Sequence, residues 1–142
     1  MSLSTALPPG VGMALTAMAY LLVKHAVADF FLQTEYQRRT KGDYGALGGI
    51  THASTHIVLT APVFWMLPPI AFGIGVALLL AEFVVHYHLD WGKERVVRAN
   101  AWTSHDTPFW WALGLDQLMH GLTYVAILWL GFGASAAPLA AA

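Results

Sequence analysis

Four apolar segments of this chain each carry two ionisable side chains spaced four residues apart. The pairs are His25 and Asp29, His52 and His56, His86 and Asp90, and Asp116 and His120. Positions i and i+4 share one face of a helix, so each segment presents one polar patch if it is helical. Ionisable groups are costly inside a membrane, where they usually mark a functional site. The recurrence indicates four helices with one polar face each.

Composition places these segments in a membrane. Hydrophobic residues make up 57% of the 142 residues and charged residues 11%, against about 25% charged residues in soluble domains. The numbers predict an integral membrane protein of one domain. The chain has no cysteine, which excludes disulfides, thiolate metal sites and a cysteine nucleophile. Its net charge of −1, with all basic residues except Lys24 gathered in two polar connections, gives no sign of a nucleic-acid partner.

An all-α fold of four transmembrane helices follows from the lengths of the apolar runs. The expected spans are residues 11–32, 47–67, 70–90 and 107–132, each near the roughly 20 residues that cross a bilayer. Residues 1–10 and 133–142 are predicted to be tails, and without signal-peptide features the first run is expected to be retained. Pro62 is expected to break the hydrogen-bond ladder of the second span. Pro68 and Pro69 predict a tight hairpin after it.

The basic residues orient this predicted bundle. They lie in the first loop and in a polar connection predicted over residues 91–106, as Arg38, Arg39, Lys41, Lys93, Arg95 and Arg98. The positive-inside rule places both connections in the cytoplasm, so both termini of the four-helix bundle are expected on the non-cytoplasmic side. All four polar pairs then fall in the cytoplasmic half of the membrane, where they can converge.

The converging side chains form a candidate metal site. The eight predicted ligands are His25, Asp29, His52, His56, His86, Asp90, Asp116 and His120. A catalytic zinc usually takes three protein ligands, whereas two-metal sites in helical bundles draw ligands from all four helices. Nitrogen and oxygen donors without sulfur fit zinc, iron or manganese, so one or two such divalent ions are expected. Haem is not expected, because the histidines come with carboxylates beside them.

Other polar residues are assigned supporting roles. Glu82 lies one turn before His86 on the same stripe and is a candidate ligand or general base. Gln33 and Gln117 flank the pairs and could orient a ligand. Lys41 and Lys93 are predicted to meet an anionic lipid head group at the membrane surface.

A lysine and three glycines inside the apolar segments have predicted roles as well. Lys24 is left open between snorkelling to the surface and pairing with Glu82. Small residues allow helices to approach closely in lipid, and Gly73, Gly75 and Gly114 are predicted to serve this purpose.

The polar residues together resemble a known family. Its pattern is matched by His25-x-x-x-Asp29-Phe30-x-x-Gln33, Lys41, His52 and His56, His86-x-x-x-Asp90-x-x-Lys93, and Asp116-Gln117-x-x-His120. This series resembles the domain-of-unknown-function family 3307 over residues 20–124. The resemblance implies a small bacterial or phage-encoded membrane protein, hence a multi-pass protein of the bacterial inner membrane. It implies no particular reaction.

Three functions stay open at this point. The first is a metal-dependent hydrolase, such as a phosphoesterase, acting on a lipid or membrane-delivered substrate, because two metals can activate a water and clamp a displacement. The second is a non-catalytic subunit that packs against a larger membrane complex or a second copy of itself. The third is a proton or ion relay along the polar stripe.

Overall fold

The structure, a computed structural model, describes residues 9–136. Within this range the chain is helical and contains no strand. The elements in chain order are α1 (Pro9–Val27), the π-helical turn η1 (Ala28–Leu32), α2 (Glu35–Thr40), α3 (Leu47–Thr60), the 3-10 helix η2 (Ala61–Trp65), α4 (Phe72–Ala99) and α5 (Thr107–Ala136). The predicted all-α fold is confirmed.

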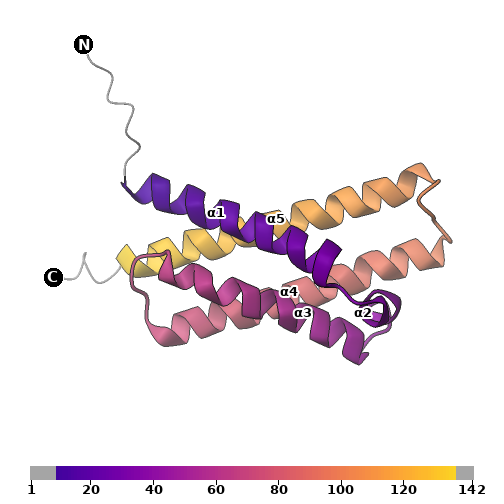
Figure 1. Cartoon of the computed structure of the whole chain (residues 1–142), viewed down its shortest axis with the longest axis horizontal. Coiled ribbons are helices and arrows are strands. Elements are labelled where there is room, and N and C mark those ends of the chain that lie inside the picture. Colours follow the sequence, from indigo (N-terminus) through magenta and orange to yellow (C-terminus); the bar gives the residue numbers. More distant parts are fainter. Residues whose placement is uncertain (1–8, 137–142) are drawn as a thin grey trace, which may run out of the picture.

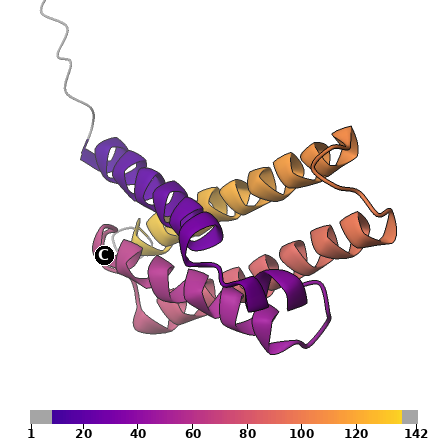
Figure 2. The ribbon, with the colours of Figure 1, turned by 45° about the vertical axis from the view of Figure 1, so that its right-hand side comes forward.

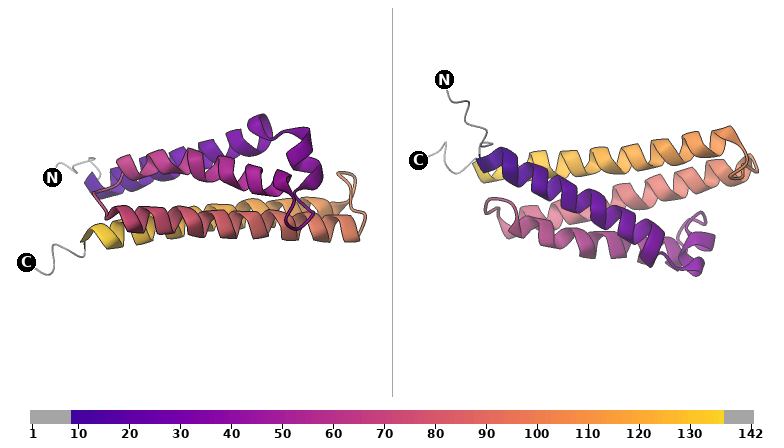
Figure 3. Two further views of the ribbon diagram at one scale, coloured as in Figure 1. Left: turned by 90° about the horizontal axis from the view of Figure 1, so that it is seen from below. Right: turned by 45° about the horizontal axis from the view of Figure 1, so that its top comes forward.

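The four long helices form an elongated bundle. The start of α1, the end of α5 and the connection from η2 to α4 lie at one end, and the other two connections lie at the opposite end (Figure 1). The helices therefore alternate in direction. Seen from the side, α1 and α3 form one layer and α4 and α5 the other (Figure 3). Each helix contacts two neighbours, so the bundle encloses one central axis.

One part of the bundle interior is an apolar core that includes Leu21, Val63 and Ile127, another part is polar, and much of the outer surface is apolar. The bundle's fully buried side chains include His56 and Glu82, whereas Trp65 is 89% exposed and Phe72 is 87% exposed. Three helices are long and apolar enough to cross a membrane, namely Gly10–Leu32, Phe72–Ala99 and Thr107–Ser135. Large exposed apolar side chains on such helices are what lipid contact requires. The chain therefore has the character of a membrane protein.

The predicted second span is not one continuous helix. It consists of the 14-residue α3 and the short η2, and neither is long enough to count as a candidate span by itself. Pro62 lies in the first turn of η2 and has no backbone N–H to continue the α-helical ladder. The predicted break at Pro62 is confirmed, while the structure yields three candidate membrane-spanning helices where four were expected.

The predicted end of the third helix and start of the second loop were wrong, whereas the first loop has its predicted bounds but contains an unpredicted short helix. Helix α4 continues through residues 91–99, which had been assigned to a loop because of their charges. This segment contains no proline, and its Arg98 donates to Asp43 Oδ1 over 3.0 Å and to the Arg39 carbonyl over 2.6 Å. The first loop contains α2, whose N-terminus is closed by reciprocal hydrogen bonds between Thr34 and Gln37.

Parts of both predicted tails are helical in the structure. Pro9 and Gly10 already belong to α1, and residues 133–136 belong to α5. The remaining parts of both predicted tails lie outside the described residues. Helix α5 begins at Thr107 with Pro108 in its first turn, in agreement with the preference of proline for that position.

Gly48, which was not predicted to have a packing role, lies at a close contact between two helices. A Cβ atom on Gly48 would overlap Thr40 Oγ1 and lie 3.1 Å from Gln37 Cα, so this glycine allows α2 to rest on α3. Gly73 and Gly114 have open space where a Cβ would be. Their predicted packing role was wrong within the single chain.

Candidate metal centre

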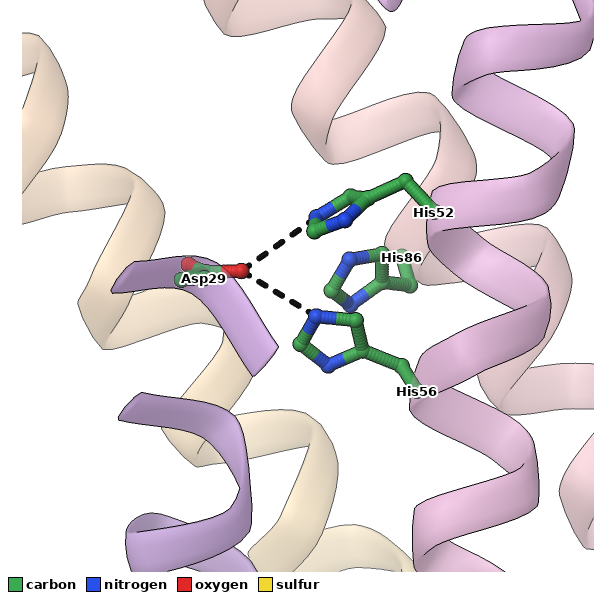
Figure 4. A group of neighbouring side chains, drawn as sticks. All are labelled: Asp29, His52, His56 and His86. Carbon is green, nitrogen blue, oxygen red and sulfur yellow. Dashed lines mark hydrogen bonds and ion pairs between the residues drawn. The ribbon is translucent and has the colours of Figure 1, made fainter. Parts of the chain in front are cut away.

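The eight predicted ligands come from all four long segments of the bundle. Asp29 lies in the π-helical turn η1 that follows α1, and its carboxylate points at imidazoles from α3 (Figure 4). A π turn contains one more residue than an α-helical turn and is frequent at functional sites. The sequence placed Asp29 on a regular helix and did not predict this turn.

The first ligand group joins η1, α3 and α4. Asp29, His52, His56 and His86 each offer an atom, and these four atoms lie within 4.8 Å of one another. Asp29 Oδ1 lies 3.1 Å from His56 Nε2 and 3.3 Å from His52 Nε2. The His86 ring lies beside the two other imidazoles in Figure 4. Three nitrogens and one oxygen match the number and kind of ligands in a four-coordinate zinc site.

The second ligand group lies on α4 and α5. His86, Asp90 and His120 again offer atoms within 4.8 Å of one another. The His86 ring centroid lies 4.3 Å from that of His120 and 3.8 Å from that of His56. The two groups are therefore adjacent and have His86 in common.

His25 and Asp116 lie at the edge of these groups. His25 Nε2 is 3.2 Å from Asp29 Oδ2, and its Nδ1 is 2.9 Å from the Tyr124 hydroxyl. Asp116 Oδ1 is 3.8 Å from His120 Nδ1. Both residues are buried, but neither belongs to a four-atom or three-atom group close enough for one ion.

Buried polar atoms without a hydrogen-bond partner mark the centre most clearly. In residues 9–136 these side-chain atoms are His25 Nε2, His56 Nδ1, Glu82 Oε2, His86 Nδ1 and Nε2, Asp90 Oδ1, Asp116 Oδ1 and His120 Nε2. All of them belong to predicted ligands or to Glu82. Some of these atoms lie near a carboxylate, such as His25 Nε2 at 3.2 Å from Asp29 Oδ2, but none makes a hydrogen bond within that range. An unsatisfied buried polar group costs about 1–3 kcal/mol, a cost that a bound cation or water would remove.

The two predicted orienting amides contact the ligands. Gln33 Nε2 lies 3.2 Å from His52 Nε2. Gln117 Nε2 donates to Asp29 Oδ2 over 3.1 Å and to Asp116 Oδ2 over 3.3 Å. In metal sites, residues behind the ligands commonly orient them by hydrogen bonds, and the two glutamines are positioned to do the same.

Glu82 lies deeper in the bundle and is held by two other helices. Its Oε1 accepts from Lys24 Nζ over 2.9 Å and from Thr60 Oγ1 over 2.8 Å, while Oε2 has no partner. Lys24 Nζ also donates to the His56 carbonyl over 3.2 Å. The open question about Lys24 is thereby answered, because it pairs with Glu82.

The two lysines expected at the lipid surface behave differently from each other. Lys41 is buried, and its Nζ lies 3.3 Å from Asp90 Oδ2, so it is part of the cluster. This position leaves it no access to a head group. Lys93 keeps partial exposure and pairs with Glu94 over 2.8 Å.

Tyr124 is a member of the site that sequence reasoning missed. Its side chain is 1% exposed, and its ring lies under the Lys24 ammonium at 4.6 Å. Tyr124 is four residues after His120, so the i, i+4 rule that found the pairs would also have placed it on their face.

A family model described as "Protein of unknown function (DUF3307)" matches residues 17–140. The chain belongs to this family. The DUF3307 match includes every residue of the two ligand groups, and the resemblance stated from the polar motifs is confirmed. No curated protein and no solved structure matches the chain.

Proposed function

We propose that this DUF3307 protein is a membrane protein that binds one or two divalent cations inside its helix bundle and uses them to hydrolyse a lipid or membrane-delivered substrate. The observation that carries the proposal is the set of unpartnered buried atoms, which gathers ligands from four separate segments in one place. Zinc, iron and manganese all suit these donors.

The proposed membrane placement uses four passes. Helix α3 and the 3-10 helix η2 together extend about 30 Å, since an α-helix rises about 1.5 Å per residue and a 3-10 helix about 2.0 Å. This length equals the hydrocarbon thickness of a bilayer. The positive-inside rule, applied to the basic residues around α2 and at the end of α4, supports a proposed orientation with that end of the bundle in the cytoplasm of a bacterial cell.

The chemistry proposed for the site is activation of a metal-bound water. A bound divalent ion lowers the pKa of its water and polarises the bond to be broken. Glu82 is the proposed general base through its free Oε2. It is the deeper carboxylate of the α4 stripe, one turn from His86.

A cavity between α4 and α5 offers a route to the site. It measures about 280 Å³, is lined mainly by apolar side chains, and has Lys93 and the predicted ligand Asp116 on its wall. The helices diverge toward their connecting loop (Figure 2). An apolar wall that carries the cationic Lys93 favours an amphiphilic substrate with an anionic group, such as a phospholipid.

Elemental analysis of the detergent-purified protein tests the proposal. We expect near-stoichiometric zinc, iron or manganese in the wild type, strongly reduced metal in His56→Ala and His86→Ala, which remove residues of the ligand groups, and wild-type metal in His105→Ala. His105 is an exposed histidine outside the centre, so it controls for binding to histidine in general. Absence of metal after gentle purification would contradict the proposal and favour a non-catalytic subunit, whose partners should then co-purify.

A further inference from the structure

His86 is distinguished from the other four histidines of the centre by its ring nitrogens. His25, His52, His56 and His120 each have at least one ring nitrogen within hydrogen-bond distance of a partner. His86 is 1% exposed, and neither its Nδ1 nor its Nε2 makes a hydrogen bond within residues 9–136; Nε2 lies 3.5 Å from Asp90 Oδ2 of the second ligand group. A neutral imidazole carries one donor and one acceptor, so both are left unsatisfied in the interior.

A single metal ion would satisfy only half of this ring. It would take one nitrogen and leave the other buried and unpartnered, at the usual cost of an orphaned polar group. Two ions, one on each nitrogen, would satisfy both. The surroundings supply ligands for both ions, because His86 is the residue common to the two ligand groups.

We infer that His86 bridges two metal ions through its two ring nitrogens. The inference rests on the proposed metal centre and specifies its architecture. Binding of the second ion displaces the ring N–H proton to the solvent, and the imidazole becomes an imidazolate. One ion is held by Asp29, His52, His56 and His86, and the other by His86, Asp90 and His120.

The two positions differ in how many protein ligands they provide. Four protein ligands close a tetrahedral site, as in structural zinc sites, whereas three leave a position for water, as in catalytic ones. The Asp29 group is therefore the closed site and the Asp90 group the open one. The open site lies on α4 and α5, the helices that line the cavity containing Lys93 and Asp116, so the reactive water belongs to the second ion.

The bridge also sets the distance between the ions. With metal–nitrogen bonds of about 2.0–2.1 Å on both sides of the ring, the ions lie about 6 Å apart. Two-metal hydrolases that share a water have ions about 3.5–4 Å apart. Ions bridged by His86 cannot share one water, so one ion activates water while the other holds the centre together.

Copper(II) is a suitable probe, because two such ions joined by an imidazolate couple magnetically and lose electron paramagnetic resonance intensity. The full-length protein in detergent is loaded with copper, and the bound ions and the resonance signal are counted. We expect two ions per chain with a signal well below two spins. Asp90→Ala and His120→Ala should each retain one ion with its full signal. His86→Ala should show no coupling, and His88→Ala, an exposed neighbour on α4, should match the wild type.

The outcomes separate this inference from the proposed function. Two ions without coupling, one ion per chain, or an X-ray absorption distance of about 3.5–4 Å between the ions would each overturn the bridge while leaving a metal centre. No specific copper, zinc, iron or manganese binding would overturn the centre itself. If His86→Ala does not fold, the wild type and Asp90→Ala still decide the question.

Discussion

Lys24 Nζ lies 2.9 Å from Glu82 Oε1, and both side chains are almost completely buried. Lys24 belongs to α1 and Glu82 to α4, while Thr60 of α3 donates to the same carboxylate oxygen. One buried carboxylate therefore connects three helices next to the candidate metal centre. The pair also leaves Glu82 Oε2 free to face other partners.

Replacing one member of this pair should destabilise the bundle. Lys24→Met leaves a buried carboxylate without its cation, and loss of one partner of such a pair costs about 3–5 kcal/mol. Thermal unfolding in detergent should show a large decrease in stability, most of which the double variant Lys24→Met with Glu82→Leu recovers. Lys93→Met, which breaks the more exposed pair with Glu94, should cost no more than about 1 kcal/mol. A double variant as unstable as Lys24→Met would show that the pair is not the cause.

Tyr124→Phe should weaken metal binding without unfolding the protein. The substitution removes the hydroxyl that lies 2.9 Å from His25 Nδ1 but keeps the ring under Lys24. Loss of a group that orients a ligand typically lowers metal affinity about 10–100-fold. Competition with a chromophoric zinc chelator measures the effect. Tyr44→Phe, whose hydroxyl contacts His88 outside the centre, is the matched control. Equal affinities for both variants would show that Tyr124 does not orient Asp29 through His25, whose Nε2 lies 3.2 Å from Asp29 Oδ2.

Gly48→Ala should disturb the contact between α2 and α3. The added methyl group would meet Thr40 Oγ1 and the backbone of Gln37, which cannot move away as a flexible side chain could. We expect a lower melting temperature and faster proteolysis of residues 34–46. Gly114→Ala adds the same methyl group in open space and should be neutral or stabilising by up to about 1 kcal/mol, the helix preference of alanine over glycine.

The connection before α5 should lose stability in acid. The Thr103 backbone N–H and hydroxyl donate to Asp106 Oδ2 over 2.8 and 2.9 Å, and they lower the pKa of Asp106. A carboxylate with a lowered folded pKa stabilises the fold above its ordinary pKa of about 3.9, and this contribution disappears as the pH falls through the folded pKa. Melting temperatures of the wild type and Asp106→Asn should differ at neutral pH and converge as the pH falls below 4. A constant difference would contradict this role.

Much of the candidate site was predictable from spacing alone. Residues such as His52 and His56 had to share a helix face, and four alternating helices had to bring such faces to one level. The buried Lys41 was not predictable, because a basic residue in a loop normally faces water or lipid head groups. Its burial follows from the position of Asp90, which attracts the ammonium group into the cluster.

Element boundaries were less predictable than element type. Charges in residues 91–99 suggested a loop, but a charged helix is stable when its polar face meets a partner, and Arg98 finds one in Asp43. The four-residue spacing likewise could not reveal the π turn at Asp29, because that turn depends on how α1 approaches α3 and α5.

The sequence by itself determined that the chain is helical, that it has a membrane protein's composition, and that its ionisable residues lie on one face of each apolar segment. These properties follow from local periodicity and from the cost of placing charge in lipid. Only the tertiary structure decided which atoms meet: Asp29 with His56, Lys24 with Glu82, and His86 between two ligand groups. Such contacts depend on the rotation and separation of helices that are distant in sequence, and side-chain packing sets both.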